Sequence, residues 1–290
     1  MASNTETETY FVPAQSKFPI WMAFGMFLTV FGASKWVQGG NALIFLSGSL
    51  VLAIVLYQWF SHQVSENIQG LVGPQLKRSY VWGMAWFIFS EVMFFAAFFG
   101  ALFYIRAFNL PWLAGEGAFE STSMLYDNFS YSWPLLSNPD NSQFLAPEGY
   151  IHATGIPLLN TIILLASSIT LTISHHALIA AKRFQMQLWL GITVLLGIIF
   201  LYYQVGEYHE AYTELGLTLN SGIYGSTFFM LTGFHGAHVT IGTLMLLIMW
   251  FRGQKGHFKA DDHFGFQAAA WYWHFVDVVW LCLFVTVYWL

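Results

Sequence analysis

The chain has 290 residues, of which 57% are hydrophobic and 9% are charged, and its formal net charge at pH 7 is −5. A soluble domain with a single core needs far fewer apolar residues, so the composition predicts an integral membrane protein. The ten Lys and Arg residues form no dense basic cluster, which argues against a nucleic-acid partner. The single cysteine, Cys282, excludes disulfides and thiolate metal sites within the chain.

Seven apolar stretches are each close to the length of about 20 residues that a helix needs to cross a bilayer. No secretory signal is expected before them, because the first residues carry acids and no basic segment. The predicted fold class is an all-α integral membrane protein, since these stretches lack the alternation of barrel strands. In chain order the predicted transmembrane helices are 18–36, 41–60, 80–105, 156–176, 186–205, 223–251 and 264–290.

The seven helices are expected to form a single membrane domain, residues 1–290. Within it we expect a tail and a hairpin of two helices at 1–60, an inner loop at 61–79, and a five-helix bundle at 80–290. An outer connection at 107–155 is rich in Asn, Ser, Pro and Gly, and it predicts irregular surface structure with one short helix.

The distribution of Lys and Arg predicts an inner amino terminus and an outer carboxyl terminus. In that orientation, eight of the ten basic residues lie on the inner side: Lys17, Lys77, Arg78, Lys182, Arg183, Arg252, Lys255 and Lys259. The outer side then carries a series of acids, namely Glu116, Glu120, Asp127, Asp140, Glu148, Glu207, Glu210 and Glu214.

Glu91 lies near the middle of the third apolar stretch, where an ionised carboxylate costs about 2.5 kcal/mol or more. With a rise of about 1.5 Å per residue, four other polar residues fall at a similar depth, about 15 to 24 Å from the inner helix ends. These residues are His235, His238, His274 and Asp277. The two histidines of the sixth stretch are three positions apart, as are His274 and Asp277, so each pair shares a helical face.

Three hypotheses fit this polar layer. It is a satisfied hydrogen-bonded cluster that fixes helix packing, a set of proton-handling groups, or a metal or haem site. A continuous proton relay would need more acids than these. A metal site is disfavoured because the sequence has no Glu-x-x-His pair and no second cysteine.

Several longer motifs resemble subunit III of haem-copper cytochrome c oxidases, and the resemblance covers all seven predicted helices. The segments that carry it are FSEVMFF at 89–95, PLLNTIILLAS at 157–167, His175 with His176, GSTFFMLTGFHGAHVTIG at 225–242 and HFGFQAAAWYWHFVDVVWL at 263–281. The last segment is long and unusual in composition, which makes a chance match negligible. The match is less specific before residue 80.

The resemblance implies a non-catalytic core subunit with no haem or copper of its own. The redox centres would lie in partner subunits, chiefly oxidase subunit I, with subunit II and small subunits alongside and cytochrome c as the substrate of the complex. Helices one and two would splay from the other five and leave a V-shaped cleft filled with phospholipid. The family's acid matching Glu91 lies beside that cleft. The subunit would sustain proton uptake, protect the oxidase from turnover-linked inactivation and guide oxygen.

The resemblance also implies lipid-binding residues. Arg252 matches the family's headgroup-binding arginine, and His257 matches a histidine just beyond it. A guanidinium can hold a phosphate bidentately, although an arginine at an inner interface is also common without a ligand. Trp59 would line the cleft, and Glu66 fits the acid a few residues later. Arg78 would match a further arginine only if the third helix begins about one turn earlier than predicted.

Two departures from the family pattern bear on function. Gln267 replaces the usual Glu near the inner end of the seventh helix, and the connection 107–155 is longer than in the mitochondrial form. The longer connection favours a bacterial cytoplasmic membrane. Two alternatives stay open, namely subunit III of a quinol oxidase and an independent proton-coupled transporter with Glu91 and Asp277 as carriers. Transporters often show inverted repeats and broken helices, and neither is visible in this sequence.

Overall fold

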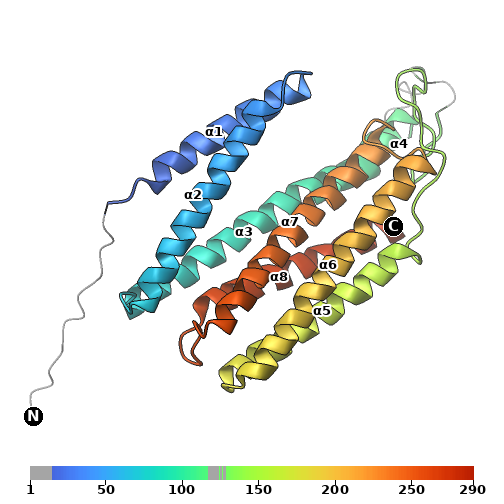
Figure 1. Ribbon diagram of the computed structural model, residues 1–290. Coiled ribbons are helices and arrows are strands. Elements are labelled where there is room, and N and C mark those ends of the chain that lie inside the picture. The colour runs from blue at the N-terminus through green and yellow to red at the C-terminus, as the bar shows by residue number, and fades with distance from the viewer. Residues whose placement is uncertain (1–14, 117–123, 125, 127–128) are drawn as a thin grey trace, which may run out of the picture. The chain divides into compact units, whose positions relative to one another are not determined.

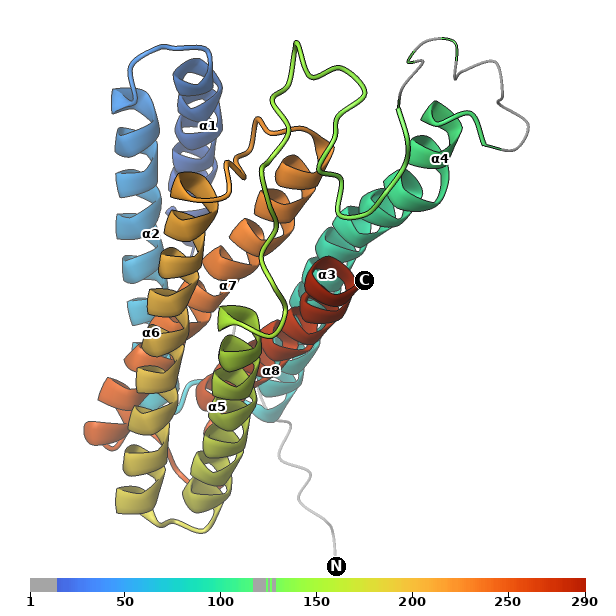
Figure 2. The ribbon, with the colours of Figure 1, turned by 90° about the vertical axis from the view of Figure 1, so that its right-hand side faces the viewer.

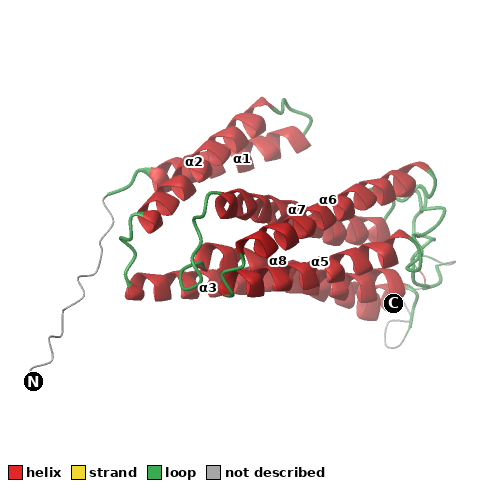
Figure 3. Cartoon of the chain, turned by 60° about the horizontal axis from the view of Figure 1, so that its bottom comes forward, coloured by secondary structure: helices red, strands yellow, loops and turns green. Residues whose placement is uncertain are grey.

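The computed structural model describes residues 15–116, 124, 126 and 129–290. Within these residues every regular element is a helix and no strand occurs (Figure 3). Seven helices of this part of the chain are long and apolar enough to cross a membrane, which confirms the predicted fold class. The amino-terminal tail and two of the predicted outer acids, Glu120 and Asp127, lie outside the described residues.

The helices follow one another along the chain with short connections except before α5 (Figure 1). Two of the elements, η1 and η3, are π-helical turns that continue the preceding α-helix. The bounds are α1 Phe18–Val37, α2 Leu43–Ile68, α3 Pro74–Tyr104, η1 Ile105–Asn109, α4 Leu110–Leu113, α5 Ile156–Ile179, α6 Arg183–Thr213, α7 Ile223–Gln254, α8 Phe264–Leu283 and η3 Phe284–Trp289.

Several predicted helix ends were wrong, and the first six transmembrane helices are each longer than the predicted apolar stretch. The predicted inner loop 61–79 shrinks to 69–73, because α2 continues to Ile68 and α3 begins at Pro74. Likewise α6 runs on to Thr213 rather than ending at Val205. Apolar side chains are needed only where a helix lies in the hydrocarbon, whereas its backbone hydrogen bonds can continue beyond the lipid. The length of an apolar stretch therefore underestimates the length of the helix. The short helix expected within 107–155 is α4, which continues α3 through η1.

The chain divides into two compact units, 1–82 and 83–290. In the first unit, α1 and α2 form a hairpin whose backbones touch at two glycines. A Cβ added at Gly32 would lie 2.3 Å from the backbone nitrogen of Phe45, and one added at Gly48 would lie 2.5 Å from that of Thr29. Small residues at such crossings allow the close helix packing that is common in membranes.

In the second unit, α5 packs against α6 and α8, and α7 packs against α6 and α8 (Figures 1 and 2). Two fully buried tryptophans of α8 bind this core to α5. The indole N–H of Trp273 donates to Ser167 Oγ at 2.9 Å, and that of Trp280 donates to Thr161 Oγ1 at 2.9 Å. These hydrogen bonds satisfy buried polar groups that would otherwise oppose packing.

Candidate functional site

Glu91 of α3 and His238 of α7 form the only direct hydrogen bond between members of the predicted polar layer in the described part of the chain. Glu91 Oε2 lies 2.8 Å from His238 Nε2. The two side chains are 22% and 12% exposed, respectively. Rings of Phe95 and Tyr272 lie against the imidazole, with centroids 4.9 and 6.3 Å away. The predicted equal depth of the two groups is therefore matched by direct contact.

The hydrogen bonds of His238 fix the number of protons in this pair. Its Nδ1 lies 2.7 Å from the backbone carbonyl of Phe234, which can only accept, so Nδ1 carries a proton. Nε2 then either accepts from a protonated Glu91 or donates to its carboxylate. Either arrangement places one proton between the two side chains and leaves the pair with no net charge, which lowers the cost of its burial.

The remaining members of the layer have separate partners. His235 is fully buried, and its Nε2–H donates to the Val276 carbonyl at 3.2 Å. His274 Nδ1 lies 2.6 Å from Ser168 Oγ. Asp277 is 5% exposed, and no hydrogen bond of good geometry reaches its carboxyl oxygens from any described residue, although Ser168 interacts with it electrostatically. The layer thus consists of local clusters rather than one chain of hydrogen bonds.

Arg252 lies in the last turn of α7 and is half-buried. Its guanidinium carbon lies 4.9 Å from the centre of the Phe258 ring, and its Nη1 donates a weak hydrogen bond to the sulfur of Met249 at 3.7 Å. None of the described carboxylates pairs with it, and its Nε is buried without a partner. The backbone N–H of His257 donates to the Arg252 carbonyl at 3.1 Å, which brings the imidazole to the same helix end.

The imidazole of His257 lies outside the transmembrane helices. Partial burial lowers its pKa below the ordinary value, and the positive charges of Arg252 and Lys255 lower the pKa further. The buried Nδ1 of His257 has no hydrogen-bond partner among the described residues. This helix end therefore offers an unpaired guanidinium and a neutral imidazole, a combination suited to an anion.

Trp59 and Glu66 line a half-open cavity of about 770 Å³ in the first unit. Glu66 is 7% exposed and its carboxylate lies 3.2 Å from Nδ1 of His62. The indole of Trp59 stacks on Phe18 at 6.0 Å. Lys17 and His62 line the same cavity, so the cavity combines one acid, two basic side chains and aromatic walls.

Arg78 is exposed and lies in the second turn of α3. It does not line the cavity that holds Trp59 and Glu66. The early start of α3 at Pro74 meets the condition under which Arg78 fits the predicted interfacial position. Of the five predicted lipid residues, Trp59 and Glu66 thus line one cavity and Arg252 and His257 lie together at the end of α7, whereas Arg78 lies near the start of α3.

Comparison with known proteins assigns the chain to a family. The pattern described as "Cytochrome c oxidase subunit III" matches residues 8–111 and 142–290. Cytochrome c oxidase subunit 3 of the dugong is 40% identical over 285 residues, covering 98% of each chain. The rabbit and hippopotamus proteins of the same name are 39% and 38% identical over 286 residues, again covering 98% of each chain.

The chain belongs to the cytochrome c oxidase subunit III family. Because subunits III are components of an oxidase, this family member is part of a complex with other oxidase subunits. The family pattern does not match residues 112–141, which fall within the predicted long connection.

One buried acid of this family member was missed by the sequence interpretation. Glu207 was expected among the outer surface acids, but it lies within α6 and is 0% exposed. Its Oε1 accepts hydrogen bonds from the Tyr288 hydroxyl at 2.6 Å and from Gln204 Nε2 at 3.2 Å. Gln204 and Glu207 are three positions apart, and this spacing was the available signal that they share a helical face.

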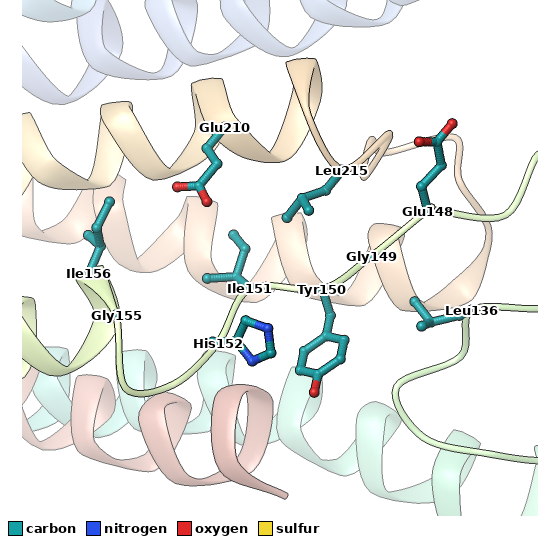
Figure 4. A pocket seen from close by; sticks show the side chains of 10 residues that line it. All are labelled: Leu136, Glu148, Gly149, Tyr150, Ile151, His152, Gly155, Ile156, Glu210 and Leu215. Atoms are coloured by element: carbon teal, nitrogen blue, oxygen red, sulfur yellow. The ribbon is translucent and has the colours of Figure 1, made fainter.

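The long connection before α5 also forms a cavity of about 500 Å³ against the end of α6 (Figure 4). Glu148 and Gly149 of the connection run past Leu215, with the Glu148 amide donating to the Leu215 carbonyl at 2.9 Å. Glu210 projects from α6 on the other side, and His152 and Tyr150 pack their rings together at 4.7 Å. Two of the predicted outer acids therefore line one hollow.

Proposed function

We propose that this chain is a non-catalytic subunit III of a respiratory cytochrome c oxidase that binds structural phospholipid and sustains proton uptake and turnover lifetime in subunit I. Haem and copper would lie in the partner subunits, subunit II and small subunits would complete the complex, and cytochrome c would be its substrate. The chain would lie in a bacterial cytoplasmic membrane with its amino terminus inside, and it would guide oxygen through its bound lipid.

The unpaired guanidinium of Arg252 is the observation that carries the lipid-binding proposal. A half-buried arginine without a carboxylate is costly unless an anion pairs with it. Arg252 ends a membrane-spanning helix, where the anion most available is a lipid phosphate. His257 would add a neutral hydrogen-bond donor to the same phosphate.

The cavity lined by Trp59 and Glu66 supports a second lipid site. Its volume of about 770 Å³ suits a headgroup with the start of its acyl chains. Lys17 offers a positive charge for a phosphate, and the buried Glu66 offers a negative charge for a headgroup cation. Trp59 provides the aromatic surface that is typical of the membrane interface.

The Glu91–His238 pair supports an indirect role in proton uptake. The pair holds one proton, and no hydrogen bond continues from it to His235, His274 or Asp277 within the described residues. An isolated pair of this kind supports a role in structure and lipid binding rather than proton conduction through this chain. Proton transfer to the redox centres would then take place in subunit I.

Quantifying the phospholipid that copurifies with the intact complex tests this proposal. Complexes with Arg252→Ala, Arg252→Lys and Lys182→Ala would be purified in parallel and their bound lipids measured by mass spectrometry. Lys182→Ala is the control, because it removes one exposed positive charge at the same end of the bundle. We expect Arg252→Ala to lose phospholipid, Arg252→Lys to retain part of it, and Lys182→Ala to retain all of it. Equal lipid content in all three would refute the proposal.

A further inference from the structure

Two histidines from distant parts of the sequence meet at the end of the bundle where α5 ends and α8 begins. His175 lies in the last turns of α5 and His263 directly precedes α8. Their Nε2 atoms are 3.2 Å apart, and the two rings meet at an angle of 72° with centroids 5.3 Å apart. Neither residue belongs to the polar layer or to the lipid-binding set described above.

His263 is held in the tautomer that a metal ligand needs. Its Nδ1–H donates to the Lys259 carbonyl at 3.0 Å, so the Nε2 of the neutral ring bears a lone pair. A backbone carbonyl on the opposite ring nitrogen is the usual support of a metal-binding histidine. The second nitrogen, His175 Nε2, becomes a lone-pair donor by a shift of its proton to Nδ1, which leaves the ring neutral.

The separation of the two nitrogens suits a shared metal ion. Two ligands at about 2.0 to 2.1 Å from a tetrahedral Zn²⁺ lie roughly 3.3 Å apart. The observed separation of 3.2 Å, which belongs to a hydrogen bond between the two rings in the absence of metal, is close to that distance. We propose that His175 and His263 form a binding site for a divalent metal of the kind that prefers imidazole, such as Zn²⁺, with water completing the coordination.

The site is expected to exchange its metal rather than to hold it permanently. Among the described residues no third His, Cys, Asp or Glu joins this pair to complete a metal-binding group. A bound ion would nevertheless tie α5 to the segment between α7 and α8. The Phe266 ring lies 5.5 Å from His175 and 6.0 Å from Phe258, the ring beneath Arg252. Metal binding would thus stiffen the segment that carries the Arg252 site.

Zinc binding to the intact complex, washed with a chelator beforehand, tests the proposal. Equilibrium dialysis against radioactive Zn²⁺ would compare the wild type with His175→Gln, His263→Gln, the double variant and His176→Gln. His176 is the control, because it is the exposed neighbour of His175 on the same helix. We expect each single variant and the double variant to lose the same one equivalent of zinc, and His176→Gln to lose none. No loss in the single variants, or an equal loss in the control, would overturn the site.

A measurement on the wild type keeps the proposal testable if the variants fail to assemble. Anomalous diffraction at the zinc edge from zinc-soaked crystals of the complex would locate the ion directly. We expect a peak about 2.1 Å from both Nε2 atoms. Zinc-saturated crystals without a peak between His175 and His263 would refute the assignment.

Discussion

Glu91 and His238 share a single proton across a 2.8 Å contact between α3 and α7. The Phe234 carbonyl fixes this arrangement, because it requires the Nδ1 proton of His238 and leaves Nε2 to face the acid. A carboxyl that looks costly when considered alone is thereby part of a neutral pair. The hydrogen bond to His238 explains why the Glu91 carboxyl is tolerated inside the bundle. Any functional role of Glu91 must be compatible with a single proton between the two side chains.

Glu91→Gln is expected to leave the initial rate of oxygen reduction unchanged while shortening the turnover lifetime or reducing the lipid content of the complex. A Gln amide can still donate to His238 Nε2, so packing is retained, but the side chain can no longer take up or release a proton. Oxygen-electrode recordings of the purified complex, followed until activity decays, give both the initial rate and the lifetime.

Glu210→Gln serves as the control for this experiment, because it removes an exposed acid from α6. Loss of nearly all initial activity in Glu91→Gln, in a complex shown to be fully assembled, would contradict the indirect role. An identical lifetime and lipid content in Glu91→Gln and the wild type would show that the carboxyl has no such role.

Gly242→Ala is expected to destabilise the bundle. The added Cβ would lie 2.8 Å from Cε3 of Trp273, a fully buried ring that also contacts Gly197 on the neighbouring helix. Overpacking of this kind costs about 1 to 3 kcal/mol. The complex should begin to dissociate at a lower temperature on heating. The release of this subunit from the complex is the signal to measure.

The matched control is Gly236→Ala on the same helix, where a Cβ meets no atom of the chain within 4 Å. This control should be neutral or gain up to about 1 kcal/mol from the better helix propensity of Ala. Equal destabilisation by both substitutions would mean that contact with Trp273 is not the cause.

Tyr288→Phe should destabilise the carboxyl-terminal end of α6. The substitution removes the shortest hydrogen bond to Glu207, a fully buried acid with only one other donor among the described residues. Leaving a buried polar group underpaired costs about 1 to 3 kcal/mol. Urea-induced dissociation of the complex should shift to lower concentration, whereas Tyr202→Phe, which alters a tyrosine that is 75% exposed, should have no effect.

Lipid retention at the Arg252 site should not change between pH 7 and pH 9. Burial first, and then the charges of Arg252 and Lys255, place the folded pKa of His257 below the ordinary value of about 6.5. A lowered histidine pKa means that the neutral imidazole is favoured in the folded protein. The contribution of the neutral imidazole to lipid retention is therefore complete above about pH 6.5 and is lost as pH falls through the folded pKa. Lipid analysis at both pH values tests this expectation. A loss of lipid between pH 7 and 9 that His257→Gln abolishes would show that a charged imidazole is needed.

Sequence alone predicted the seven helices, because each apolar stretch long enough to cross a bilayer forms one in the structure. The helix ends were predicted poorly. Residues such as Ser65 and Glu207 are polar and yet helical, and hydropathy contains no information on where the backbone leaves the helical conformation. The burial of Glu207 depends on Tyr288, 81 positions away, and only the folded arrangement reveals it.

The sequence predicted the depth of the polar-layer residues in the membrane but not their hydrogen-bond partners. Counting helical rise placed Glu91 and His238 at the same level, and the structure joins them. The same count could not show that His274 turns to Ser168 on α5 or that His235 turns to the Val276 carbonyl. It could not bring His175 and His263 together either, because they lie 88 positions apart on segments whose packing depends on the whole bundle.

The continuous helical segment Pro74–Leu113 contains 40 residues. A helix of that length extends for about 60 Å, roughly twice the thickness of the hydrocarbon core. Even when strongly tilted, it must emerge from the lipid by several turns at one or both faces. Near the carboxyl-terminal end of this segment, the Arg106 guanidinium donates hydrogen bonds to the backbone carbonyls of Thr286 and Leu290. These bonds attach the segment to the last residues of the chain. The connection that follows therefore begins at a helix end that is anchored to the last residues of the chain, beyond the length that the hydrocarbon core requires.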